Sequence, residues 1–599
     1  GVSSNAISVP AAVAPKGFSA GVAFSETETN SAAEATGIDA GRGEDVIENA
    51  SVVSATSAAT TKTKSVSVNF AEAGAAIADI SSEAKAESTG LEGGEGVDEL
   101  TNSGTVIASA TSVSDDTGAA ANLAGYARGD IESTSMATAT GLSGGETSAG
   151  QTIGDALTNT SGARIEATAT ANAYADNYVV QGGGVQFAKV GSTTDAHATA
   201  MAGGVLGDTI ENDGTVISTA ISDLHANSFN FQLFGVQAGS VGVNAVGTAR
   251  GIDASAGENT VMNSAEGTID TYADLKTTSL NTEASIGAQL TRAGVTADAV
   301  SQGILSGADR DIIDNDGSIT ATAKSLGQAG GASIGLISAS LVNALASADI
   351  DGISAGGGND VVTNDGIITA GAIKTGDSFL VKAETAAVSF DFASLIFSSL
   401  GAEASITGIQ GGAGNDTIFN NGIIYIGNEA PDDGCTDQRS MVIGDSFSYG
   451  GQWLGTTFAF SGSSARNTSI GIDGGADNDA LVNSGIVTVK ARSYGDVGAE
   501  VSLGIGLLDS LAKAQVESTA KATGIFGGTG EDTITNYSTI AADALTIADA
   551  QTEATIDLAT EPEATSEATA VARAVGMDGG SLGKKTFEWF EGLFIPEPK

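Results

Sequence analysis

Hydrophobic and polar residues alternate along most of the chain, and the alternation is interrupted about every fifty residues. In residues 65–70 and 387–392, for example, β-branched and aromatic side chains alternate with small or polar ones. Just before most interruptions, alanine recurs at every second position, as in residues 402–406. Alternation with a period of two predicts β-strands, so each unit is expected to form about three strands joined by turns.

Each interruption contains one copy of a motif, which is most complete in residues 411–420 (GGAGNDTIFN). Ten copies are countable, and an eleventh begins at residue 576 and breaks off. An aliphatic residue follows the acidic position by two residues and an asparagine follows it by four, as Ile418 and Asn420 follow Asp416. The acids are Asp45, Asp98, Asp155, Asp208, Asp311, Asp360, Asp416, Asp479 and Asp532, and Asn259 takes their place once.

The spacing within the motif indicates which side chains face inward. Residues at even spacing lie on one face of a strand, so the aliphatic residue and the asparagine are expected to share an interior. A buried asparagine needs hydrogen-bond partners, and identical asparagines stacked one above another supply them, amide to amide.

Two architectures fit this pattern. Three small coils per unit would separate the Asp turns by roughly 14 Å, whereas one wide coil per unit would stack them roughly 4.8 Å apart. We favour the wide coil, because it places every asparagine over an asparagine and explains why one side in three keeps the motif. The sequence thus predicts an all-β fold: a parallel β-helix (β-solenoid) of about eleven wide coils, with roughly fifty residues and three strands per coil, in a rod roughly 50 Å tall.

The repeat also divides the chain. Residues 1–36 are expected to form an N-terminal strand or cap, residues 37–580 the solenoid, and residues 581–599 an aromatic cap or docking tail. Insertions at residues 146–154 and 428–435 are expected to leave the solenoid as surface loops. The second contains Cys435, the single cysteine, which we interpret as an exposed, incidental thiol rather than a crosslink between chains.

Charge narrows the range of partners. The chain has 73 Asp and Glu residues against 25 Lys and Arg, a formal net charge of −48. This disfavours nucleic acid and anionic membrane surfaces and favours divalent cations. No run of about 18 apolar residues could span a bilayer, and residues 1–5 lack the features of a signal peptide. We therefore expect either a mature product or a chain exported without an N-terminal signal.

The turns resemble a known repeat. Residues 93–101, 411–419 and 527–535 match Gly-Gly-x-Gly-x-Asp-x-aliphatic-x in full, and other copies match in part. The motif resembles that of RTX (hemolysin-type) calcium-binding β-roll proteins, and the continuation Asn-x-Gly-x-Ile resembles passenger regions of secreted bacterial adhesins. The resemblance implies that the nine motif acids and the turn carbonyls bind Ca²⁺. Because RTX proteins repeat the motif in tandem and this chain has one copy per unit, calcium between coils requires the wide coil.

Physical chemistry points to the same ion. Glycine permits the positive φ angles that aim carbonyls at one point, and Ca²⁺ binds six to eight oxygens. Stacked carboxylates about 5 Å apart repel by several kcal/mol at an effective dielectric near 20, and a cation between them removes this repulsion. The alternative is that these are water-exposed Gly-Asp turns. Ten phased copies favour the cation, with the weaker copies near Asn259 and in the third and fourth repeats as candidates for empty sites.

The sequence predicts a structural role rather than an enzyme. His197 and His225 bear no fixed relation to the repeat, and no Lys or Arg recurs beside the phased acids, as cleavage of an acidic sugar would favour. We expect an extracellular or cell-surface protein that associates with itself into a filament, surface layer or matrix. The alternatives are an adhesin that binds a ligand through its loops and, less favoured, a carbohydrate-active enzyme.

Overall fold

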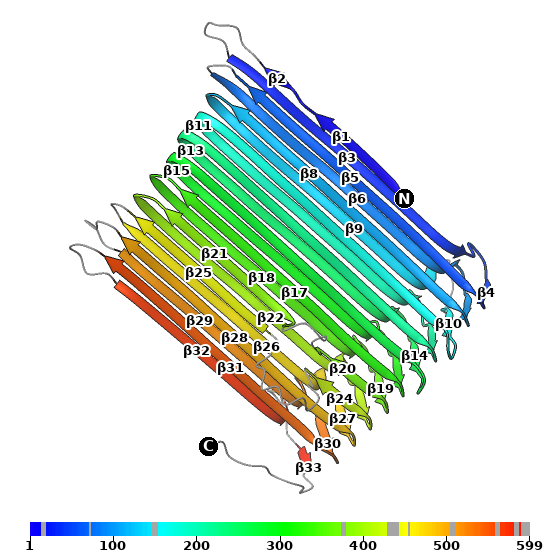
Figure 1. The fold of residues 1–599 in the computed structure, drawn as a ribbon. Helices are drawn as coiled ribbons and strands as arrows, with labels where there is room; N and C mark the ends of the chain where they lie inside the picture. Colours follow the sequence, from blue (N-terminus) through cyan, green and yellow to red (C-terminus); the bar gives the residue numbers. More distant parts are fainter. Residues whose placement is uncertain are drawn as a thin grey trace.

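The structure is a computed structural model, and it describes residues 1–12, 20–70, 73–146, 154–372, 379–427, 442–452, 456–503, 510–556, 563–579 and 586–588. Its regular secondary structure within these residues is entirely β, in 33 strands that pair in parallel throughout. No helix in this part of the chain has the length and hydrophobicity of a membrane span. The chain is therefore a parallel β-solenoid (Figure 1), as the repeat predicts.

One coil consists of two long strands and one short strand. In the second coil, β5 (Val52–Asn69) runs outward, the chain turns back at a bend, and β6 (Ala73–Glu95) returns to the motif turn and the short strand β7 (Glu99–Asn102). Each following coil repeats this path 49 to 63 residues later, with every short strand in register with its neighbours. The wide-coil architecture is therefore confirmed, with three strands per coil.

The strands fall into three groups. The short strands form an eleven-stranded sheet: β4 (Val46–Asn49), β7, β10 (Ala156–Asn159), β12 (Thr209–Asn212), β14 (Thr260–Asn263), β16 (Ile312–Asn315), β19 (Val361–Asn364), β23 (Thr417–Asn420), β27 (Ala480–Asn483), β30 (Thr533–Asn536) and β33 (Thr586–Glu588). The outward long strands are β1 (Val2–Ser8), β2 (Ala11–Ala12), β5, β8 (Thr105–Asn122), β17 (Ser318–Ile334), β20 (Ile367–Ala370), β21 (Val381–Phe390), β24 (Ile423–Ile426), β25 (Val442–Gln452), β28 (Ile486–Leu503) and β31 (Ile540–Ile556).

The returning long strands are β3 (Ala20–Asp39), β6, β9 (Gly125–Glu146), β18 (Ile337–Ser354), β22 (Ala393–Ala413), β26 (Thr457–Ala476), β29 (Ser510–Phe526) and β32 (Glu563–Asp578). In three middle coils the strand continues through the bend, giving β11 (Arg164–Gly204), β13 (Thr215–Ser255) and β15 (Thr268–Leu305). We call the short sheet with its turns the motif end, and Figure 1 shows it opposite the bends.

The molecule is a slab rather than a rod. A long strand of 18 residues, such as β8, spans roughly 60 Å, whereas eleven stacked coils rise roughly 50 Å. The expected height agrees with the coil count, but the expected rod shape is wrong, because the long strands make each coil wider than the stack is tall.

Small side chains fill the slab. Every second residue in the first part of β11 is buried, and from Ala167 to Ala175 these are alanines with exposures of 0–1%. Elsewhere hydroxyls bond across the interior, as where Ser135 Oγ of β9 donates to Ser112 Oγ of β8 at 2.8 Å. Because alanine and serine let the two sheets approach closely, large side chains are displaced to the outer faces, and Phe390 and Phe392 are about half exposed.

The bends are closed from inside by amide side chains. Gln181 Nε2 donates to the carbonyls of Gly125 and Gly183, at 2.7 and 2.9 Å, and Gln232 Nε2 donates to Gly184 O at 2.8 Å. These bonds satisfy turn carbonyls that would otherwise be buried without donors. The N-terminal residues 20–36 belong to β3 and so form part of the first coil. Cys435 and nearly all of the proposed C-terminal tail lie outside the described residues.

Candidate metal centre

The motif turn depends on positive φ angles. Gly412 and Gly414 have φ of 105° and 126°, and in the next coil Asp477, which stands where other copies have the third glycine, has φ of 77°. Residues with a side chain rarely adopt this region. The glycines also allow close stacking, since a Cβ on Gly412 would lie 1.8 Å from the carbonyl oxygen of Gly356 in the coil below.

The asparagines form the predicted ladder. In each coil the Nδ2 of one asparagine donates to the Oδ1 of the next, at 2.6 to 2.9 Å, in an unbroken series from Asn49 to Asn536. Those in the middle of the stack are 0–1% exposed. A buried amide bonded at both ends costs little, whereas one orphaned in the core costs about 1–3 kcal/mol.

The motif acids form a second ladder, built from one backbone and one side-chain group. The backbone N–H of Asp360 donates to Oδ1 of Asp416 at 2.8 Å, and the N–H of Asp416 donates to Oδ1 of Asp479 at 2.9 Å. The same bond joins every coil from Asp45 to Asp532, including the coil with Asn259. The structure therefore brings all nine predicted acids into one inward-facing column.

Sequence reasoning missed the direction of these acids. The Asp, the aliphatic residue and the Asn have even spacing, so the parity that places Ile418 and Asn420 inside also places Asp416 inside. Exposures of 1% at Asp208, 2% at Asp98 and 9% at Asp532 confirm this orientation. The signal was present in the spacing, and it excludes the alternative of water-exposed side chains for these acids. Asp45, in the first coil, is half-buried.

The second carboxylate oxygen is the unsatisfied atom of the site. Within the described part of the chain, Oδ2 of seven acids is buried and has no hydrogen-bond partner: Asp45, Asp98, Asp208, Asp360, Asp416, Asp479 and Asp532. It points into the turn, where a Cβ on the first glycine of the motif would lie 2.7 Å from Oδ2 at both Gly411 and Gly474. Asp311 differs, because its Oδ2 accepts the N–H of Gly307 at 3.2 Å.

Burial weakens the acidity of this column. It raises the pKa of Asp208, Asp360 and Asp479 to about 7, although the backbone N–H donated to each lowers the pKa in part. It also raises the pKa of Asp98, Asp155, Asp311, Asp416 and Asp532. A desolvated carboxylate near neutrality holds a proton or recruits a cation more readily than an exposed one does.

Asn259 indicates what Oδ2 faces. Its Oδ1 accepts the N–H of Asp208 at 2.9 Å, as an Asp would, and its Nδ2 donates to Gly257 O at 3.0 Å. The atom that corresponds to Oδ2 therefore lies beside a turn carbonyl. Where the residue is Asp, two oxygens would face each other, and a proton or a cation between them would remove the repulsion.

The residues of the motif turns meet some, but not all, of the requirements of a cation site. Buried Oδ2 atoms, turn carbonyls and glycines without a Cβ are the donors and the space that Ca²⁺ needs. Against this, the described residues include no group of three or more His, Cys, Asp or Glu side chains that could hold a metal ion. Many turn carbonyls also accept amides of the adjacent coil, as Gly356 O does from Ala413 N at 2.9 Å. A cation here would depend on few side-chain ligands.

A third ladder, formed by exposed asparagines, runs outside the other two and was not predicted. Asn359 Oδ1 accepts the N–H of Asn415 at 2.8 Å, Asn415 Oδ1 accepts that of Asn478 at 3.1 Å, and Asn478 Oδ1 accepts that of Glu531 at 2.8 Å. These exposed asparagines directly precede the motif acids. Their position in the sequence, repeated in three successive copies, is the signal that could have found them.

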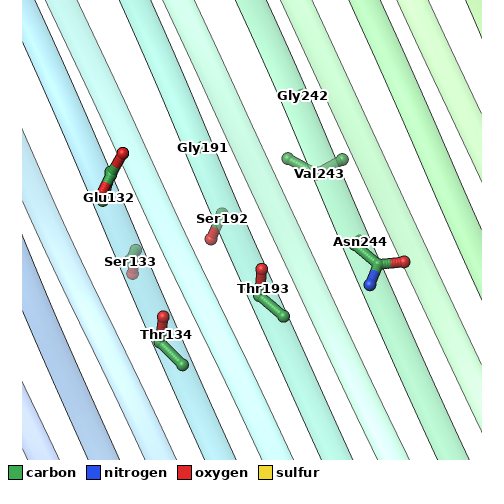
Figure 2. A pocket seen from close by; sticks show the side chains of 9 residues that line it. All are labelled: Glu132, Ser133, Thr134, Gly191, Ser192, Thr193, Gly242, Val243 and Asn244. Atoms are coloured by element: carbon green, nitrogen blue, oxygen red, sulfur yellow. The ribbon is translucent and has the colours of Figure 1, made fainter.

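A polar groove lies on a long outer face, away from the motif. The groove crosses β9, β11 and β13 and has a volume of about 420 Å³. Figure 2 shows the nine residues that line it. Gly191 and Gly242 form its floor, since neither has a side chain, and Glu132, Thr193 and Asn244 stand beside it. It contains none of the predicted site residues.

The histidines are placed individually along the long strands. His197 Nε2 lies 2.7 Å from Asp195 Oδ1, and His225 Nε2 lies 2.8 Å from Asp223 Oδ1, so each contacts the acid two residues before it. His225 also stacks on Tyr174 of the adjacent coil, with ring centroids 5.8 Å apart.

Comparisons of the chain with protein-family models, with curated proteins and with solved structures gave no match. The resemblance of the turns to RTX repeats therefore stays a prediction.

Proposed function

We propose that this chain is an extracellular structural subunit that stacks end to end with copies of itself, in a filament, layer or matrix stabilised by calcium. The observation that carries this proposal is the pair of open ends. Within the described residues, β31 and β32 pair only with β28 and β29 of the preceding coil, and β1 and β3 only with β5 and β6 of the following one.

The two ends complement each other. All pairing is parallel, so a second copy placed on β31 and β32 through its own β1 and β3 would continue the same register. Its contact would be heterologous, which generates an open filament rather than a closed dimer. Unpaired strand edges of 16 and 17 residues are strong templates for such addition.

Calcium would act at the inward column. The ligands would be Oδ2 atoms of the motif acids, such as Asp360, Asp416 and Asp479, together with carbonyls of the glycine turns. A bound divalent cation supplies positive charge that offsets the repulsion between stacked carboxylates and carbonyls. The chain's own residues hold the column in register, because each Oδ1 is fixed by an amide of the adjacent coil.

The end-to-end proposal is tested with a lysine inside the last coil. Ala570 pairs with Ser518, which is fully buried, so Ala570 faces the interior that a second copy would cover. Ala570→Lys should shorten or abolish filaments seen by electron microscopy, because stacking would bury the charge. Val571→Lys, one residue on and 48% exposed, is the matched control. Wild-type protein that stays monomeric at all calcium concentrations would contradict the proposal.

The calcium proposal is tested with the substitution that the chain itself contains. Asp360→Asn/Asp416→Asn/Asp479→Asn should fold, because Asn259 already occupies the same position with the same bond. Wild type should gain thermal stability on calcium titration, followed by circular dichroism, and the triple variant should gain less. Equal stability of both proteins with calcium and with a chelator would leave a proton, not a metal, as the group that neutralises the column.

An adhesin is the second candidate, and the groove in Figure 2 favours it. Its hydroxyl, amide and carboxylate groups could accept a polar ligand. Glycan-array binding that is lost on Gly242→Gln, while the fold is retained, would support this function over the structural one.

A further inference from the structure

The bends carry most of the exposed large apolar side chains in the middle of the slab. We define the apolar bend as the outward-facing side chains of residues 178–187, 229–236, 284–288, 334–337 and 390–397. Among them, Phe231 is 49% exposed, Phe234 56%, Ile334 53% and Phe390 48%. These residues lie at the same end of successive coils, so they form one continuous surface along the stack.

The apolar bend is larger than a soluble monomer normally exposes. Its aromatic and aliphatic side chains together expose on the order of 1,000 Å², whereas the largest apolar patch on a typical monomer is about 300–600 Å². A standard protein interface buries about 800 Å² on each partner. The surface is therefore of the size that a stable dimer needs.

The apolar bend is also free of exposed charge. Within its ranges the one Asp, Glu, Lys, Arg or His residue is Asp391, which is buried and accepts hydrogen bonds from Ser389 Oγ and from the N–H of Gly335. The chain as a whole carries a net charge of −48. Two copies can approach at this surface without placing like charges opposite each other, whereas anionic lipid would be repelled by the flanking faces.

The row of side chains along the bend complements itself. Phe231, Ala284, Ile334 and Phe390 occupy the same register position in four successive coils. Their sizes run large, small, medium, large. A two-fold axis through Ile334 places Phe390 of one copy opposite Ala284 of the other, so a large residue meets a small one.

The small residue at Ala284 leaves a real hollow. A cavity of about 290 Å³ lies between Phe231, Ile286 and Ile334, with Ala284 at its base. Phe390 stands one coil beyond Ile334 and contacts Tyr449 in a tilted arrangement, with ring centroids 5.5 Å apart, and its side chain is 48% exposed.

We propose that the apolar bend binds the apolar bend of a second copy of this chain, around a two-fold axis through Ile334. Phe390 of each copy fills the hollow above Ala284 of the other, which Phe231 and Ile334 of that copy border. Such an interface is isologous and closes with two copies. It is lateral to the stack, so it joins neighbouring slabs side by side and is independent of the end-to-end contact.

The experiment measures the mass of the full chain by sedimentation, in the Ala570→Lys background so that end-to-end stacking does not contribute. This protein should be dimeric at micromolar concentration. Phe390→Glu/Phe392→Glu should weaken the dimer at least ten-fold, because both side chains are exposed and the charges would be buried between copies. Ala284→Trp, which fills the hollow, should weaken it as well.

The matched control is Val205→Glu/Ile312→Glu, which places two charges on apolar side chains of 56% and 41% exposure outside the bend. It should leave the dimer unchanged, and circular dichroism checks that every variant folds. A monomeric parent protein, or a dimer insensitive to the bend variants, would overturn the proposal. Flotation of a monomer with neutral phosphatidylcholine vesicles, lost in the bend variants, would overturn it in favour of a lipid partner.

Discussion

The motif end and the apolar bend close the same sandwich of strands in different ways. At the motif end, an asparagine and an aspartate in each coil bond to the equivalent groups of the next coil, so the same residues must recur. At the bend, Gln181 and Gln232 bond to nearby turn carbonyls inside the coil stack, and the outward residues share only an apolar character. The contacts of the motif end are therefore completed within the chain, whereas the apolar bend is a surface that a partner would complete.

The largest loss of stability is expected from substitution of an asparagine in the middle of the ladder at the motif end. Asn420→Ala removes the acceptor of Asn364 Nδ2 and the donor to Asn483 Oδ1, both of which are buried. Two orphaned groups should lower the free energy of unfolding by about 3 kcal/mol, measured from urea unfolding followed by circular dichroism.

The neighbouring Asn421 provides the matched control. It is exposed, and its Nδ2 donates to Asp365 Oδ1 at 2.7 Å on the surface. Asn421→Ala should cost less than about 1 kcal/mol, because water replaces the lost bond. Equal effects of the two substitutions would mean that the ladder contributes no more than a surface bond.

The structure of the motif end could be predicted from the sequence because the same residues recur there in successive coils. The spacing of Asp416, Ile418 and Asn420 predicted the coil width, the asparagine ladder and the register, all of which are confirmed. The same spacing carried the inward direction of the acids. Their bonds to the N–H groups of adjacent coils could not be predicted, because backbone donors are the same in every residue and the sequence does not show which ones a turn leaves free.

The bend resisted prediction for a different reason. In residues 387–392, alternation predicts a strand but does not decide which set of side chains faces inward. Ser389 and Asp391 are buried, and Phe390 and Phe392 are half exposed, the reverse of the usual preference. The thickness of the interior decides which set of side chains faces inward, and alanines and serines of the opposite sheet determine that thickness. A local stretch of sequence does not show which residues of the opposite sheet it will face.

The next largest effect on stability is expected at a buried acid near the bend. Glu283 is fully buried, and in register it adjoins Asn230 and Ser333 rather than another acid. Both of its carboxylate oxygens lack a partner at normal hydrogen-bond geometry, although the Thr291 hydroxyl and the Gly239 N–H lie near enough to offset part of the effect of burial. Burial raises the pKa of Glu283 to about 8.

The raised pKa of Glu283 determines how the stability of the protein changes with pH. Because folding raises the pKa above its ordinary value of 4.5, the contribution of Glu283 is fully present below about pH 4.5 and is lost as the pH rises through about 8. Between pH 5 and pH 9, wild type should therefore lose more thermal stability than Glu283→Gln. Glu403→Gln, on the exposed outer face, should lose as much as wild type, and identical profiles for all three would contradict the assignment.

The smallest effect is expected where one motif turn departs from the others. Asp477 adopts φ of 77° in a position that is Gly358, Gly414 or Gly530 in other coils, with φ of 137°, 126° and 144°. A side chain in the left-handed region costs about 1 kcal/mol relative to glycine. Asp477 also lies near Asp416 and, by its charge, raises the pKa of that acid. Asp477→Gly should stabilise the protein by about 1 kcal/mol in urea unfolding, whereas Asp477→Ala, which removes the charge but keeps the Cβ, should gain less; a larger gain from alanine would show that charge, not backbone conformation, limits this turn.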